Sequence, residues 1–109
     1  MKIISYRRTI HNNPEVGTEL PKTKAYVMDK LREFGYEPKE ICESGIVATI
    51  EGSKSGKTFL LRADMDALPM AEATGLDFKS NNGSMHSCGH DMHTAMLLGA
   101  DKTIKTKSK

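Results

Sequence analysis

The sequence contains no tryptophan, and its aromatic residues are limited to three tyrosines and three phenylalanines. Proteins that bind single-stranded nucleic acid stack bases on aromatic side chains, for which this chain offers few candidates. Its net charge at pH 7 is only +2 over 109 residues, which is too small to attract a polyanion strongly. These two deficits argue against a nucleic-acid partner.

Cysteine is also scarce, because only Cys42 and Cys88 are present and they stand in different sequence surroundings. No structural disulfide is therefore predicted. No apolar run approaches the length of a membrane span, and residues 1–10 carry charge without the apolar core of a secretory signal. We expect a cytoplasmic protein without a membrane partner, comprising at most one modest domain or part of a larger one.

The spacing of apolar residues predicts two helices in the first third of the chain. The first covers residues 3–10 and ends at Asn12-Asn13-Pro14, where His11 is expected to satisfy the helix end rather than to bind metal. The second helix is expected to have Thr18 as its N-cap and to end at Gly35, with an apolar stripe facing the core.

The middle of the chain predicts β structure. Residues 46–50 and 58–61 have the composition of strands and are joined by a predicted turn over residues 52–57. A further helix is expected to begin at Asp91 and to lead into a polar, lysine-rich tail over residues 101–109. Helices combined with strands predict an α/β fold.

Residues 85–93 concentrate the side chains that bind transition metals. Imidazole and thiolate suit a borderline-soft ion such as zinc. If residues 86–90 run extended, the side chains of His86, Cys88 and His90 project to the same side, and Gly89 allows the backbone to turn. Two alternatives remain at this point: a histidine-rich surface loop with a buried Cys88, and a redox-active Cys88. The candidate ligands are His86, Cys88, His90, Asp91 and His93.

A second group of candidates lies where the predicted strand 58–61 ends, because Asp64 and Asp66 are spaced two residues apart and can face one side. Carboxylates at the carboxyl end of a strand are well placed for a site in an α/β sheet. Taken alone, they could equally serve as turn residues before Pro69. Because the histidine and cysteine loop follows only about two dozen residues later, we expect one shared site.

Three segments, in this order and spacing, carry a family resemblance: RRTIHNNPE (7–15), LRADMDALP (61–69) and MHSCGHDMHTAMLLGA (85–100). The chain resembles the N-terminal part of the aminoacylase and carboxypeptidase superfamily of metallohydrolases. It is most similar to the amidohydrolase branch, which includes hippurate hydrolases, N-acyl-amino-acid amidohydrolases, N-acetyldiaminopimelate deacetylases and indoleacetyl-amino-acid hydrolases. The resemblance implies that residues 1–109 are a partial zinc-peptidase-like catalytic domain, with helices packed on a mixed sheet.

The resemblance also implies a site that binds two divalent metal ions, zinc, manganese or cobalt, and hydrolyses the amide bond of an N-acylated amino acid or peptide. Carried over by position, Cys88 and His90 would be metal ligands. Either Asp64 or Asp66 would be the active-site aspartate, which holds a ligating imidazole in orientation. The choice between the two aspartates stays open. His86, Asp91 and His93 lie inside the motif as possible accessory residues.

In this family, a glutamate acts as general base, and it lies downstream of the helix that begins near Asp91, together with further ligands. Arg62 and Glu72 belong to the family pattern without an assigned role, and no glutamate follows Glu72. We therefore expect the 109-residue chain to be the N-terminal segment of a metal-dependent amidohydrolase and to be inactive alone. The alternative is a non-catalytic truncated remnant with residual metal binding or with self-association into a homo-oligomer.

Overall fold

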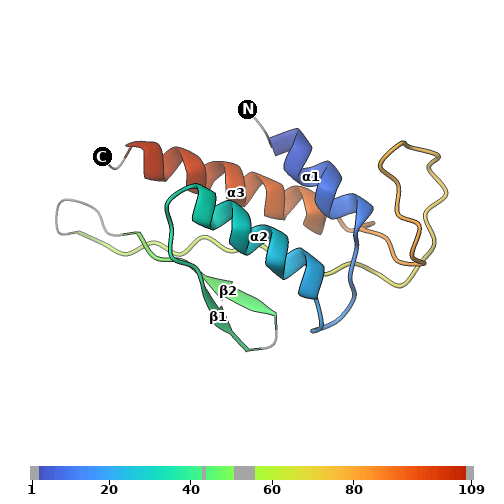
Figure 1. The fold of residues 1–109 in the computed structure, drawn as a ribbon, viewed down its shortest axis with the longest axis horizontal. Helices are drawn as coiled ribbons and strands as arrows, with labels where there is room; N and C mark the ends of the chain where they lie inside the picture. Colours follow the sequence, from blue (N-terminus) through green and yellow to red (C-terminus); the bar gives the residue numbers. More distant parts are fainter. Residues whose placement is uncertain (1–2, 43, 51–55, 108–109) are drawn as a thin grey trace.

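The computed structural model describes residues 3–42, 44–50 and 56–107. Three helices form one layer, and a two-stranded hairpin lies beside the second helix (Figure 1). The helices are α1 (Ile3–Asn12), α2 (Pro21–Glu33) and α3 (His90–Lys107). The described part of the chain has no helix that is both long enough and apolar enough to cross a lipid bilayer.

The longest helix, α3, forms the centre of the layer and packs against both α1 and α2. Ala95 and Leu98 of α3 are buried together with Tyr6 of α1. At Gly99, an added Cβ atom would lie 2.6 Å from Cδ1 of Ile3, so the absence of a side chain permits this close approach of α1 and α3. The core therefore lies along one face of α3. The predicted helix 3–10 is confirmed.

The start of helix α2 differs from the prediction. Thr18 was the expected N-cap, but that prediction was wrong because the N-cap residue is Leu20, which has no side-chain cap. The carboxylate of Glu15 accepts hydrogen bonds from the backbone N–H groups of Lys22 (3.2 Å) and Thr23 (2.7 Å) instead. An acidic group at this end also complements the helix dipole.

The C-terminal end of α2 is as predicted. Gly35 has φ +97°, a left-handed conformation that glycine adopts without strain. Its N–H group donates to the carbonyl of Arg32 (3.0 Å), and the N–H group of Tyr36 donates to the carbonyl of Leu31 (3.0 Å). This hydrogen-bond pair is a Schellman motif, and it brings Tyr36 into the same core as Leu31.

The β structure is smaller than expected. Strands β1 (Lys39–Ile41) and β2 (Gly45–Val47) pair in antiparallel fashion, with Glu40 opposite Ile46. The predicted strand 46–50 is therefore confirmed only at its start. The predicted strand 58–61 was wrong, because these residues form no described ladder and Leu60 is 88% exposed. The predicted turn falls partly on residues 51–55, outside the described residues.

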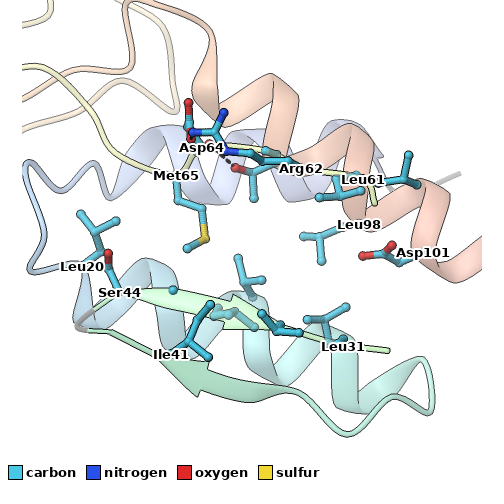
Figure 2. A pocket seen from close by; sticks show the side chains of 18 of the residues that line it. Leu20, Leu31, Ile41, Ser44, Leu61, Arg62, Asp64, Met65, Leu98 and Asp101 are labelled. Atoms are coloured by element: carbon cyan, nitrogen blue, oxygen red, sulfur yellow. Dashed lines mark hydrogen bonds and ion pairs between the residues drawn. The ribbon is translucent and has the colours of Figure 1, made fainter. Parts of the chain in front are cut away.

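A groove of about 470 Å³ runs between α2, β2, α3 and the extended segment that precedes Ala67 (Figure 2). Arg62, Asp64 and Asp66 also line it, so the groove reaches the candidate site. Burial raises the pKa of Asp101, on the α3 side, to about 6. The apolar wall includes Leu20, Val27, Leu31, Ile46, Met65 and Leu98.

Candidate metal centre

The loop before α3 places its candidate ligands at different depths. His86 is buried at 4% exposure, whereas Cys88 is exposed. The chain is fixed before His86 by the pairing of Met85 with Leu68, and it bends at Gly89, where φ is +85°. Residues 86–90 are therefore not extended throughout, and the common side expected for His86 and Cys88 is not formed.

The sequence-predicted aspartates do meet a histidine. Nδ1 of His90 lies 3.0 Å from both the backbone carbonyl oxygen and the carboxylate Oδ1 of Asp66. Nε2 of the same ring lies 4.0 Å from Oδ2 of Asp64. Two acceptors at Nδ1 favour the tautomer that carries its proton there, which leaves the lone pair on Nε2.

Asp64 has two further constraints. Its carboxylate pairs with Arg62 at 2.6 Å, as Figure 2 shows, and its backbone carbonyl accepts a hydrogen bond from the Thr94 hydroxyl of α3 at 2.8 Å. The second contact joins the extended segment to the first turns of the helix that carries His90. The structure thus brings Asp64, Asp66 and His90 together.

The remaining motif residues lie elsewhere. His93 is exposed on α3, with its ring centroid 6.1 Å from that of His90. Burial lowers the pKa of His86, and neither of its ring nitrogens has a hydrogen-bond partner within the described residues. Asp91 is fully buried behind the loop and accepts a hydrogen bond from Arg7 Nε at 2.8 Å. These three residues do not join the group formed by Asp64, Asp66 and His90.

Sequence reasoning missed a buried ionic cluster behind this loop, which we call the His11 cluster (Arg7, His11, Glu72 and Asp91). Nδ1 of His11 lies 2.8 Å from Asp91, and Nε2 lies 2.8 Å from Glu72. The prediction that His11 satisfies its own helix end was wrong, because both ring nitrogens lie against carboxylates from distant segments. The spacing of Arg7 and His11, four residues apart on one helix face, was the available signal.

Glu72 is held firmly in that cluster. Burial by itself would raise the pKa of the Glu72 carboxyl, but hydrogen bonds from the Thr74 hydroxyl and the Ser80 N–H group, together with nearby His11, lower the pKa overall. The side chain of Glu72 is fully buried, and both of its oxygens accept hydrogen bonds. Glu72 is therefore structural and is unsuited to act as a general base.

Three comparisons found known proteins to which this chain is similar. The sequence model of peptidase family M20/M25/M40 matches residues 60–109, which contain the two aspartates and the loop before α3. The structure superposes with a TM-score of 0.93 on the YXEP protein of Bacillus subtilis, a dinuclear metal-binding peptidase of the M20 family, with 34% sequence identity. That superposition covers 98% of this chain and 31% of the other. The chain resembles the N-terminal portion of an M20 peptidase.

The chain is also similar to curated proteins that are named as a carboxypeptidase and a hydrolase. The chain is 51% identical over 100 residues to thermostable carboxypeptidase 1 of Saccharolobus solfataricus, covering 89% of this chain and 25% of the relative. It is 46% identical over 104 residues to hippurate hydrolase of Campylobacter jejuni, covering 94% of this chain and 27% of the relative. The chain thus spans about a quarter of the length of these relatives. The predicted fold class, a portion of an α/β metallohydrolase domain, is confirmed.

Proposed function

We propose that this chain contributes part of the active site of a metal-dependent amidohydrolase that acts on N-acyl amino acids. The observation that supports this most directly is the His90 ring, which is held at Nδ1 by Asp66 and follows Cys88 by two residues. A carboxylate that orients a ligating imidazole is the usual arrangement around a protein-bound metal. The resemblance to M20 peptidases supplies the class of reaction.

The donor set fits a metal ion in part. Cys88 offers an exposed thiol, and His90 offers Nε2, so these two residues would hold a divalent ion such as zinc, manganese or cobalt. The described residues contain no group of three or more histidine, cysteine, aspartate or glutamate side chains arranged to hold a metal. We infer that further ligands would come from another part of an M20-type polypeptide.

The chain's own residues would prepare that site. Asp66 keeps the His90 proton on Nδ1 and so fixes the direction of the Nε2 lone pair, which makes Asp66 our choice for the orienting aspartate. Arg62 holds Asp64 beside the ring. A bound divalent metal would polarise the substrate carbonyl and lower the pKa of a water molecule. The general base would not be Glu72, since its carboxylate is buried and already accepts hydrogen bonds at both oxygens.

The proposal is tested by replacing the aligned N-terminal part of Campylobacter jejuni hippurate hydrolase with this chain, which is 46% identical to that region. We expect the chimera to hydrolyse hippurate when manganese or zinc is supplied, whereas the isolated chain should not. Within the chimera, Cys88→Ala should abolish turnover, and Cys42→Ala should leave it unchanged. A folded, metal-loaded chimera without turnover would contradict the proposed function.

A second candidate function is self-association through residues 57–62. Phe59 and Leu60 are 84% and 88% exposed, and none of the described backbone hydrogen bonds involves this extended segment. Unpaired apolar edges of this kind pair readily with another chain. This segment could therefore form a strand with a second copy.

Sedimentation velocity over a range of protein concentrations tests this candidate. Self-association should weaken at least about tenfold when Leu60 is replaced by lysine, because a charge on the edge opposes pairing. Leu76→Lys is the matched control, since Leu76 is 44% exposed in a different loop. A monomeric wild-type chain at all concentrations would exclude this function.

A further inference from the structure

The His11 cluster connects three segments that are distant in the sequence. His11 lies on α1, Glu72 on the loop after the extended segment, and Asp91 in the first turn of α3. The side chains of these three residues are only 3%, 0% and 1% exposed, respectively. A cluster of ionisable groups that is this well buried must be hydrogen-bonded and nearly balanced in charge, because uncompensated buried charge is costly.

The hydrogen bonds of the cluster constrain the protonation of His11. Each ring nitrogen faces a carboxylate oxygen at 2.8 Å. A neutral imidazole has only one N–H group, so its other nitrogen would direct a lone pair at a carboxylate. An imidazolium has two N–H groups and can donate to both Glu72 and Asp91.

The other partners of the two carboxylates favour the same state. Glu72 already accepts from the N–H group of Ser80 at 2.9 Å and from the Thr74 hydroxyl, and Asp91 accepts from Arg7 at 2.8 Å. Both groups are therefore surrounded by donors, as carboxylates require. With His11 charged, two cations and two anions balance to zero in the cluster, whereas a neutral His11 would leave one uncompensated negative charge.

We propose that His11 is a positioning residue: as a buried imidazolium it fixes Asp91, and through Asp91 the first turn of α3, so that His90 keeps its Nδ1 proton on Asp66. Asp91 directly follows His90 in the first turn of α3 and is fully buried. Its Oδ1 accepts a hydrogen bond from the N–H group of Met92 at 2.9 Å and its Oδ2 contacts His11, so this carboxylate links His11 to the start of the helix. The use of His90 Nε2 as a metal ligand rests on the proposed function. The protonation of His11 and the tautomer of His90 are independent of that function.

Nitrogen-15 NMR of the four histidine rings in the metal-free chain tests both parts. At pH 7, both ring nitrogens of His11 should show the chemical shifts of protonated nitrogens, and His90 should be predominantly the Nδ1–H tautomer. An unprotonated nitrogen in the His11 ring would overturn the proposal. The spectra need neither metal nor substrate, so an inactive chimera would count against the proposed function while leaving this result standing.

His11→Gln tests the positioning role. In a folded His11→Gln chain, His90 should lose its preference for Nδ1–H, and the Nε2–H form that a solvated imidazole usually adopts should predominate. Thr9→Ala is the matched control, because Thr9 is exposed on the same helix and its hydroxyl donates to the Ser5 carbonyl one turn earlier. An unchanged His90 tautomer in folded His11→Gln would overturn the positioning role.

Glu72→Gln decides the question if His11→Gln does not fold. It preserves the shape of the side chain and an oxygen that accepts from Ser80, while it removes one negative charge from the cluster. We expect the His11 ring to lose one proton and the His90 preference for Nδ1–H to weaken. If a folded Glu72→Gln chain retained both wild-type signatures, the proposal would be wrong.

Discussion

Asp91→Ala is expected to lower the free energy of unfolding by about 3–5 kcal/mol, the usual cost of removing one partner of a buried ion pair. Asp91 is fully buried, and a single oxygen, Oδ2, lies 2.8 Å from Arg7 Nε and 2.8 Å from His11 Nδ1. Its loss leaves His11 without a partner on one side. Because Arg7 is 30% exposed, solvent can compensate only that cation.

Urea denaturation followed by circular dichroism measures this effect, and a chain that is already unfolded in the absence of urea would meet the expectation. Asp29→Ala is the matched control, since Asp29 also pairs with an arginine, Arg32, but at 3.6 Å on the exposed face of α2. An exposed pair contributes about 0–1 kcal/mol. Asp91→Ala and Asp29→Ala of equal cost would show that the buried cluster does not stabilise the fold.

The helices could be predicted because their signals are local. Pro21 at the start of α2 and Gly35 beyond its end, with an apolar stripe between them, act within a few residues. Thr18 was a reasonable N-cap by residue type. The chain instead uses Glu15, whose hydrogen bonds to Lys22 and Thr23 depend on the path of the connecting loop. Cap identity is therefore less predictable than helix position.

Strand formation could not be predicted in the same way, because a strand needs a partner. Residues 58–61 have suitable composition, yet no described segment pairs with them, and Phe59 and Leu60 face solvent. Strand β2 pairs instead with β1 (Lys39–Ile41), a segment without a strong strand signal. A composition that favours β structure is therefore not sufficient for a strand, because another segment must also lie where it can pair.

The candidate site also combines local features, which could be predicted, with long-range contacts, which could not. The local pattern predicted one shared site for the two aspartates and the loop before α3, and the structure brings Asp64, Asp66 and His90 together. The depth of His86 depends on the pairing of Met85 with Leu68, and the His11 cluster joins positions 61 to 84 residues apart. Such long-range contacts have no periodic signature in a single sequence. The proximity of these residues could be predicted from the sequence, whereas the buried contacts behind them could not.

Cys88→Ala is expected to reduce the zinc affinity of this chain by at least about 100-fold, whereas Asp66→Ala should reduce it by about 10- to 100-fold. The larger effect follows because Cys88 would donate directly to the ion, and a thiolate is a preferred zinc ligand. Asp66 acts through the His90 ring at 3.0 Å, and the loss of such an orienting group costs 10- to 100-fold in other metal sites.

Competition with a chromophoric chelator measures these affinities, and Cys42→Ala is the matched control because Cys42 is an exposed cysteine on a different loop. Equal losses for Cys88→Ala and Asp66→Ala would contradict the assignment of one as ligand and the other as orienting group. If Cys88→Ala still bound zinc with wild-type affinity, the Cys88 thiol would not be a ligand. If Cys88 then reacted rapidly with thiol reagents in the absence of metal, the redox alternative would account for it better, because such reactivity follows the thiolate fraction and not a bound ion.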